Sequence, residues 1–587
     1  MAIPTRLFDL PSHQLKNFPR TDLFNTKHEG KWTSMSTHAF MAKCTQYARG
    51  LIQYGIKPGD FIAVASANRV EWNILDIAVQ QIGAVLVPLY PNISSKDYAY
   101  ILNDCGAVLM FVGNEEIALK INEIRDNASK LKEVFAFDTI AGTTHWTNLL
   151  LAYESIPESE VNDRMQQVKE DDLATIIYTS GTTGNPKGVM LSHKNILSNV
   201  LACVEPIPAD NQSRVLTFLP ICHIYERMLH YLYMYIGCAI YFAESMDTIG
   251  ENIKEVKPHV FSAVPRLIEK VFDKIMSKGE ELKGIKKVLF YWAVNLAEKY
   301  NDVHNSAWYR CRLSVARKLI FKKWQEALGG NVNAIASGSA ALQPRLARIF
   351  LAAGIPILEG YGMSETSPVI SVNCHSKGIR VGTVGALIEG VEVKFEADGE
   401  ILVKGPNVML GYFNNPEATN EVFTEDGWLK TGDIGTFQDE VFLKITDRKK
   451  EIFKTSGGKY IVPQYIENTM KESRFVAQIM VVGENQKFPA AFIVPNFSFV
   501  KEWAERHDMD FTGMKNEEIV ENPKVIARIE KEVAEMNGQL GSWEQLKKIK
   551  LISQEFTIDG EELTPTLKLR RKNILAKYNQ AFQNLYQ

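Results

Sequence analysis

A run of glycine, serine and threonine residues from Tyr178 to Gly188 has the composition of a phosphate-binding loop. It follows the apolar segment Leu173–Ile177, for which the sequence predicts a strand. Small residues let the backbone approach a polyphosphate, and N–H groups, hydroxyls and Lys187 together suit several negative oxygens. The run contains no Gly-Lys-Ser/Thr tripeptide, so it is not a Walker A loop.

Six further motifs follow this loop in order along the chain. They are Leu219–Arg227, Ser337–Ala340, Tyr361–Thr366, Trp428–Asp433, Asp447–Glu451 and Leu563–Lys568. With the loop, they resemble the ordered motifs of the adenylate-forming superfamily, which includes acyl-CoA synthetases, peptide-synthetase adenylation domains and luciferases. One motif alone would be weak support, but seven in the same order form a specific pattern.

The resemblance implies that a carboxylate attacks the α-phosphorus of ATP. Both reactants are anionic, so the site must neutralise charge and hold them in line. By resemblance, Lys568 is the cation that bridges the carboxylate and the α-phosphate, and Glu365 is the catalytic carboxylate and Mg²⁺ ligand. His223 either gates the path between carboxylate and thiol or is an ordinary pocket histidine, because nothing nearby completes a metal-ligand set.

The same resemblance implies a set of nucleotide-binding residues. Lys187 faces the phosphates that leave as pyrophosphate, Tyr361 offers a ring to adenine, and Asp433 accepts from the ribose hydroxyls. The full set is Thr179, Ser180, Gly181, Thr182, Thr183, Gly184, Lys187, Gly338, Ser339, Ala340, Tyr361, Gly362, Ser364, Asp433 and Arg448.

CoA is the thiol acceptor that the resemblance implies for the second half-reaction. The small C-terminal domain then rotates about a hinge at Lys450, as rigid-body domains commonly do. After that rotation, Gly457 and Gly458 let the pantetheine arm pass close to the backbone.

Several departures from the general pattern resemble long-chain fatty acyl-CoA synthetases. Pro565-Thr566-Leu567 precedes Lys568 where many relatives have glycine, and Lys257–Arg266 has a form typical of that branch. The resemblance therefore implies a long-chain fatty acid as substrate. Two alternatives stay open: transfer to a free acyl carrier protein, and a catalytically inactive binding protein.

Alternation of strand-like and helical segments predicts the fold of the first part. Phe61–Ala65 and Ala107–Val112 are strand-like, with helical periodicity around Trp72 to Ile82 between them. This predicts an α/β architecture: a large N-terminal domain of mostly parallel sheets flanked by helices, residues 1–447, and a small mobile α+β domain, residues 448–587.

Composition bounds the remaining possibilities. The chain has 587 residues and a formal net charge of −3, which gives no reason to expect a nucleic-acid partner. Scattered cysteines and the lack of a signal or spanning segment predict a cytoplasmic protein, monomer or homodimer. The helical segment 283–323 carries ten basic residues against two acidic ones, so it is either a solvated face or a peripheral contact at the inner face of a membrane.

Overall fold

The computed structural model describes the chain except residues 1–2, 180–184, 450, 512, 559 and 565–567. It divides into two compact units. Unit 1 comprises Met1–Lys394, Leu402–Lys430 and Phe437–Lys444, and unit 2 comprises Phe395–Ile401, Thr431–Thr436 and Ile445–Gln587. Each unit has its own hydrophobic core. The chain passes between the units several times, and the expected boundary between residues 447 and 448 stays a prediction.

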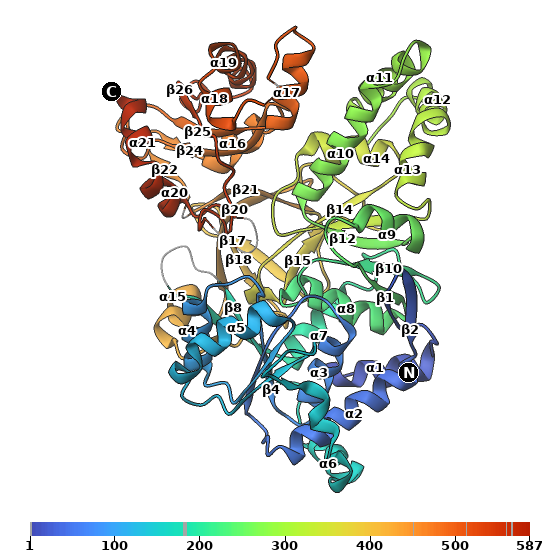
Figure 1. Ribbon diagram of the computed structural model, residues 1–587. Coiled ribbons are helices and arrows are strands. Elements are labelled where there is room, and N and C mark those ends of the chain that lie inside the picture. The colour runs from blue at the N-terminus through green and yellow to red at the C-terminus, as the bar shows by residue number, and fades with distance from the viewer. Residues whose placement is uncertain (1–2, 180–184, 450, 512, 559, 565–567) are drawn as a thin grey trace. The chain divides into compact units, whose positions relative to one another are not determined.

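The first sheet of unit 1 carries the strand that leads into the phosphate loop (Figure 1). Its order is β19 (Gly411–Tyr412), β9 (Lys187–Ser192), β8 (Leu173–Thr179), β4 (Val85–Leu89), β3 (Phe61–Ala65), β5 (Leu109–Val112), β6 (Glu133–Ala136) and β7 (Thr144–His145). From β8 to β7 the strands are parallel, whereas β8, β9 and β19 pair antiparallel. The βαβ alternation predicted from the sequence is confirmed.

Helices connect these strands as the periodicity predicts. They are α3 (Val70–Gln81), α4 (Ser95–Cys105) and α5 (Glu115–Ile124). Ser94 caps α4 by accepting from the Asp97 N–H, and Gly106 ends it in the left-handed region at φ 66°. Helices α1 (Leu10–Asn17), α2 (Thr37–Gln53), α6 (Glu158–Gln167) and α15 (Pro416–Val422) complete this part.

The second sheet of unit 1 positions most of the other motifs. Nine of its thirteen described strands lie wholly in unit 1, in the order β16 (Ala386–Leu387), β15 (Val369–Val372), β14 (Ile357–Gly362), β13 (Ala334–Ser337), β12 (Val260–Ala263), β10 (Arg214–Thr217), β11 (Ala239–Phe242), β1 (Phe24–His28) and β2 (Lys31–Met35). Strands β14 to β10 are parallel, so their carboxyl ends share one edge. The motifs after β10, β13 and β14 therefore lie at the same edge.

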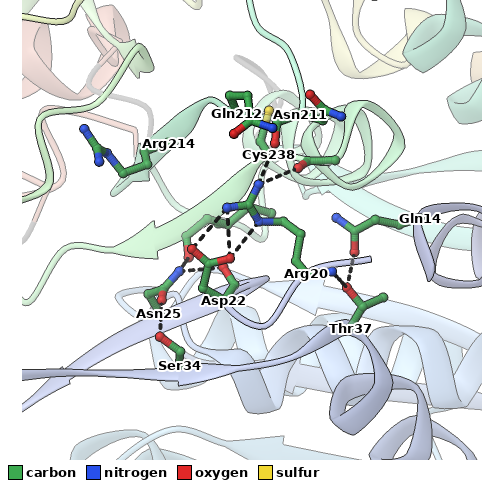
Figure 2. Close-up of polar contacts among 12 residues, drawn as sticks. Gln14, Arg20, Asp22, Asn25, Ser34, Thr37, Asn211, Gln212, Arg214 and Cys238 are labelled. Atoms are coloured by element: carbon green, nitrogen blue, oxygen red, sulfur yellow. Dashed lines mark hydrogen bonds and ion pairs between the residues drawn. The ribbon is translucent and has the colours of Figure 1, made fainter. Parts of the chain in front are cut away.

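Helix α8 (Ile224–Ile236) begins within the motif Leu219–Arg227 that follows β10, and it is fixed at its far end by Arg20. The Arg20 guanidinium donates to the carbonyls of Asn211 and Gly237, at 2.6 and 3.1 Å, and forms a two-pronged pair with Asp22 (Figure 2). Gly237 is the C-cap of α8, where a cation stabilises the exposed carbonyls. Thr37 accepts from the Arg20 N–H and donates to Gln14, which ties this anchor to α1 and α2.

Unit 1 also contains a helical lobe, whose helices lie before and after β12 in the chain. It contains α9 (Ile249–Val256), α10 (Pro265–Glu280), α11 (Ile285–Glu298), α12 (Ala307–Ala316), the π-helical turn η5 (Arg317–Phe321), α13 (Lys322–Ala327) and α14 (Pro344–Ala352). Its core includes Phe272, Phe290, Phe321 and Trp324. The predicted helical character of residues 283–323 is confirmed, and Figure 1 shows α11 and α12 at the outer end of this lobe.

Unit 2 has a small sheet covered by helices. Strand β25 (Ala490–Pro495) pairs antiparallel with β24 (Val476–Val482) and parallel with β26 (Lys548–Leu551). The helices are α16 (Pro463–Met470), α17 (Phe497–Glu505), α18 (Asn516–Val520), α19 (Pro523–Asn537), α20 (Arg571–Lys577) and α21 (Asn579–Tyr586), and a short ribbon joins β22 (Phe453–Lys454) to β23 (Tyr460–Ile461). Strands β17 (Glu392–Phe395), β18 (Glu400–Lys404), β20 (Leu429–Gln438) and β21 (Phe442–Arg448) contribute residues to both units.

Among the described helices, none combines the length and apolar character needed to traverse a bilayer.

Candidate active site

The two ends of the phosphate-loop segment are held together by β8 and β9. Thr179 ends β8 and Lys187 begins β9, and the two are paired in the antiparallel register, with Thr179 Oγ1 3.5 Å from the Lys187 carbonyl oxygen. Gly188 packs so closely that a Cβ would lie 2.7 Å from an Ile176 methyl. Five predicted ligands (Ser180, Gly181, Thr182, Thr183 and Gly184) lie outside the described residues.

Lys187 and Glu365 meet at Tyr412. The Lys187 ammonium lies 5.0 Å from the Tyr412 ring centroid, and the Tyr412 hydroxyl donates to Glu365 Oε1 at 2.8 Å. Tyr412 reaches this place because β19 pairs with β9, and the Met409 N–H holds the Glu365 carbonyl at 2.8 Å. Burial and the neighbouring Glu365 charge raise the pKa of Tyr412 far above its usual range, so it stays a donor. The geometry thus places one cation and one carboxylate beside the loop.

The turn after β14 presents Ser364 and Glu365. Only glycine fits at 362, because a Cβ there would lie 1.7 Å from the Pro368 carbonyl oxygen. Thr366 donates to that same carbonyl at 2.6 Å, and Asn407 donates to the Thr366 carbonyl at 2.9 Å. This rigid turn, η6 (Ser364–Thr366), leaves the Ser364 and Glu365 side chains only slightly exposed.

The segment Ser337–Ala340 after β13, part of which is predicted to bind the nucleotide, packs against the first residues of α8. Tyr225 lies beneath Gly338, where a Cβ would stand 3.6 Å from its ring carbon. The Tyr225 hydroxyl and the adjacent Ser337 hydroxyl are buried and, within the described part of the chain, have no hydrogen-bond partner. Two unsatisfied hydroxyls beside a glycine fit a site that a polar ligand completes. Ser339, at φ 70°, and Ala340 continue the turn, and the half-buried Tyr361 ends the neighbouring β14.

His223 caps α8 at the same edge. Its Nδ1 accepts from the Tyr225 N–H at 3.2 Å, and the ring is half-buried. Asn68 fixes the preceding loop, since its amide donates to the Leu219 carbonyl at 2.7 Å and accepts from the Ile221 N–H at 2.9 Å. The cap explains the position of His223, and its gating role stays a prediction.

Glu226 and Arg227 belong to the motif Leu219–Arg227, although no role is predicted for them from the sequence. The Glu226 carboxylate accepts from the hydroxyls of Thr217 and Ser262, at 2.5 and 2.6 Å, so it links α8 to β10 and β12. Burial raises its pKa to about 7, although both hydroxyl contacts act against this shift. A charged side chain inside an otherwise apolar helix was the available signal in the sequence.

Glu226→Gln is expected to become more stable than the wild type as pH rises. The unfolded chain loses the Glu226 proton near 4.5, whereas the folded chain keeps it to about 7, so the contribution of Glu226 to stability is present below 4.5 and lost as pH rises to about 7. Glutamine removes this loss. Between about pH 5 and about pH 8, the free energy of unfolding of the variant should gain on the order of 2 kcal/mol over the wild type. Urea unfolding followed by circular dichroism measures it, and a pH-independent difference would contradict it.

In unit 2, Asp433 and Arg448 come together as the ribose pair would require. Arg448 Nε donates to Asp433 Oδ1 at 3.1 Å across β20 and β21, and the Asp433 side chain is mostly buried. The Asp433 N–H donates to Thr431 Oγ1 at 3.1 Å, which holds the aspartate in place. Lys450 lies outside the described residues.

Lys568 is exposed in unit 2 and follows residues 565–567, which lie outside the described part of the chain. The Thr564 N–H donates to the Lys568 carbonyl at 2.8 Å, and the Lys568 N–H donates to Thr564 Oγ1 at 3.1 Å. Leu563 and Leu569 form an isolated antiparallel β-bridge. Gly457 and Gly458 lie in the exposed turn between β22 and β23, where Gly458 has φ 76° and the Thr455 N–H donates to the Lys459 carbonyl. Gly457, Gly458 and Lys568 are therefore all open to solvent.

Residues 12–413 match the AMP-binding enzyme family, and residues 450–587 match the AMP-binding enzyme C-terminal domain. The chain belongs to the AMP-binding enzyme family. Among curated relatives of this AMP-binding enzyme, Mycobacterium bovis long-chain-fatty-acid–CoA ligase FadD15 is 33% identical, covering 95% of this chain and 93% of that protein. Human long-chain-fatty-acid–CoA ligase 1 is 32% identical, covering 95% and 82%.

Solved structures confirm the fold of this AMP-binding enzyme. The anthranilate CoA ligase AuaEII in complex with anthranoyl-AMP has a TM-score of 0.74 at 19% identity, covering 99% of both chains. An ATP-bound RpMatB-BxBclM chimera has a TM-score of 0.74 at 21% identity, covering 99% and 100%. The α/β fold with large sheets and a small C-terminal domain is therefore established. The protein is an AMP-forming adenylating ligase of the acyl-CoA synthetase type, which binds ATP and a carboxylic acid.

Proposed function

We propose that this enzyme is a long-chain fatty acid–CoA ligase. It joins a long-chain fatty acid to AMP with release of pyrophosphate, then transfers the acyl group to CoA with release of AMP. The convergence of Lys187 and Glu365 on Tyr412 is the observation that carries the proposal, since it supplies the charges that a magnesium polyphosphate needs. The named activity of relatives aligned over 95% of the chain supports the choice of acid.

Each residue has a physical task in the first half-reaction. A fatty carboxylate oxygen bonds to the α-phosphorus, and the bond from that phosphorus to pyrophosphate breaks. Lys187 balances the charge of the leaving phosphates, and Ser364 donates to the α-phosphate. Lys568 neutralises the carboxylate and α-phosphate together, which lowers the repulsion between two anions.

Mg²⁺ fits the residues present, because it prefers one or two carboxylates with phosphate oxygens and water. Within the described ranges no cluster of three or more histidine, cysteine or acidic side chains forms a metal cage, and the single buried Glu365 suits this mode instead. When bound, Mg²⁺ supplies positive charge to the phosphate oxygens. Glu365 holds its position through Tyr412.

The second half-reaction needs a thiol to reach the acyl carbon, where a carbon–sulfur bond forms and the bond to AMP breaks. Residues 448–587 act as a mobile domain in this step, turning about Lys450 so that Gly457 and Gly458 line the path of the pantetheine arm. The exposure of this glycine turn in unit 2 supports that role.

Tyr412→Phe is expected to weaken Mg-ATP use without unfolding the site. Phenylalanine keeps the ring beneath Lys187 but removes the hydrogen bond to Glu365, and bonds to charged groups contribute about 1.5–3 kcal/mol. ATP–pyrophosphate exchange should fall by at least roughly tenfold, with a higher Mg²⁺ requirement. Tyr460→Phe, an exposed tyrosine in unit 2, is the matched control. An unchanged Mg²⁺ dependence would remove Tyr412 from the site.

A product assay tests the proposed function directly. Purified enzyme with Mg-ATP, CoA and fatty acids of graded length should form AMP and acyl-CoA together, with long chains preferred. If the enzyme forms AMP but no acyl-CoA, and forms a thioester on an added acyl carrier protein, the acceptor is the carrier protein and not CoA. Preference for short or aromatic acids would refute the long-chain assignment, and no turnover with any acid would favour a binding protein.

A further inference from the structure

The outer side of α11 and α12 carries two rows of apolar and cationic side chains that the adenylation chemistry does not use. Helical spacing of three and four residues places each row on one side of its helix. We define the α11–α12 face by these rows, which are Ile285, Val288, Trp292, Asn295 and Lys299 on α11, and Trp308, Arg312, Val315 and Leu319 on α12 and η5.

Large hydrophobic side chains of this face are open to solvent. Ile285, Val288 and Trp308 are 75%, 67% and 72% exposed. The opposite sides of the same helices already supply the core of the lobe, through residues such as Phe290 and Leu313. The helices thus carry exposed apolar side chains on the side away from the core as well, and exposed apolar side chains with polar neighbours are typical of a surface that contacts another molecule.

A cavity of about 530 Å³ opens between α11 and α12 on this face. Trp292 and Tyr309 are among its aromatic walls, and Lys287, Lys299 and Arg312 bring positive charge to it. The Tyr309 hydroxyl donates to the Leu296 carbonyl at 2.6 Å, and the Arg312 guanidinium lies 5.8 Å from the Trp292 ring. Aromatic walls with cationic neighbours suit an amphiphile that has an anionic head.

The charge of the segment is strongly positive and its two acids are engaged elsewhere. Glu298 pairs with Arg345 at 2.7 Å, and Asp302 accepts from the Val381 N–H at 2.8 Å. Lys283, Lys286 and Lys318, by contrast, are exposed. The local charge is therefore opposite in sign to the net charge of −3 of the whole chain.

We propose that the α11–α12 face docks the enzyme on the anionic surface of a lipid bilayer, with Trp308 and the aliphatic residues entering the headgroup region. Lysine and arginine beside tryptophan and aliphatic side chains are the composition of interfacial helices, whose cations bind anionic lipids. A second copy of this chain is a poor occupant, because two cationic faces repel each other. Nucleic acid is also a poor occupant, because it would leave the exposed side chains of Ile285, Val288 and Leu319 without an apolar partner. Trp324 of α13 lies in the core of the lobe and does not belong to this face.

Co-sedimentation of the full-length enzyme with vesicles tests the electrostatic part. Binding is expected with phosphatidylcholine mixed with phosphatidylglycerol, to weaken with added salt, and to be absent with phosphatidylcholine alone. The triple variant Lys286→Gln, Lys287→Gln, Lys299→Gln should bind about a hundredfold more weakly, because each lysine near an anionic lipid surface contributes about 1 kcal/mol of attraction. The control is Lys31→Gln, Lys43→Gln, Lys57→Gln, which removes three exposed lysines on β2, on α2 and after α2.

Fluorescence quenching tests insertion at the level of one residue. Brominated lipid in the mixed vesicles should quench the wild type more than Trp308→Phe. Trp543→Phe removes a half-exposed tryptophan of unit 2 and should be quenched like the wild type.

Failure of the wild type to bind mixed vesicles would overturn the proposal, as would undiminished binding by the lysine variant or unaltered quenching in Trp308→Phe. Sedimentation velocity tests whether a second copy of the chain occupies the face. If the protein self-associates, the same lysine substitutions abolish this self-association, and no vesicle binding occurs, the face is assigned to a second copy. Turnover of dispersed substrate should be equal in both triple variants, which shows that each is folded. These outcomes do not depend on which acid the enzyme prefers.

Discussion

Lys568→Ala is expected to lower acyl-adenylate formation by roughly 10²–10³-fold, the usual effect of removing one group that stabilises developing charge. The loss should appear in kcat for ATP–pyrophosphate exchange, because the proposed mechanism places this lysine where the carboxylate and the α-phosphate approach each other. ATP affinity should change little, since Lys187 and Glu365 lie on other elements. The measurement is exchange at saturating ATP and fatty acid, with AMP and acyl-CoA quantified separately.

The local structure makes this variant interpretable. Main-chain groups of Lys568 form two hydrogen bonds with Thr564, and an alanine side chain leaves both bonds in place. Lys572→Ala, an exposed lysine on α20, serves as the control for loss of positive charge in unit 2. Equal exchange rates in wild type and Lys568→Ala would remove this lysine from the chemistry, and an equal loss in both variants would indicate a nonspecific charge effect.

Much of the fold could be predicted because the local signals agree with the tertiary structure. The apolar segment Phe61–Ala65 becomes β3, and the Trp72 periodicity becomes α3, since strands buried on both faces read as continuous apolar runs. The helical character of residues 283–323 was likewise readable. The exposure of the apolar side chains on the outer side of these helices could not be predicted, because helical periodicity alone does not show which side of a helix packs against the core.

The side-chain contacts of the site could not be predicted in the same way. Tyr412 lies 47 residues beyond Glu365 and reaches it only because β19 adds to the edge of β9. No local pattern encodes such a pairing, which depends on sheet order. The orphaned hydroxyls of Tyr225 and Ser337 are also products of tertiary packing, since they follow from the approach of α8 to the end of β13.

A buried ionic network joins α8 to the strand of the phosphate loop. Arg227 pairs with Asp76 of α3, and both side chains are at most 3% exposed. Arg227 also donates to the hydroxyl of Thr175 on β8 at 2.8 Å, and Thr175 donates to the Leu86 carbonyl. Tyr231 and Gln80 donate to Asp76. The helix that begins at His223 and the strand that ends at Thr179 are therefore held by one guanidinium.

Asp76→Ala is expected to destabilise the protein by about 3–5 kcal/mol, because it leaves the Arg227 charge buried and unpaired. Arg227→Met alone should cost a similar amount by stranding Asp76. The double variant Asp76→Ala, Arg227→Met should be more stable than either single variant, since no buried charge remains without a partner. Urea unfolding of the four proteins gives the coupling free energy.

Activity separates the two roles of this network. If the guanidinium also positions the site, the double variant should regain stability but not ATP–pyrophosphate exchange, because methionine cannot donate to Thr175. If the double variant recovers both stability and ATP–pyrophosphate exchange, the network contributes to stability alone. If the losses of stability in the two single variants add up in the double variant, Asp76 and Arg227 do not act as a pair. The expected separation follows from geometry: the charge balance needs two residues, whereas the link between α8 and β8 needs the arginine itself.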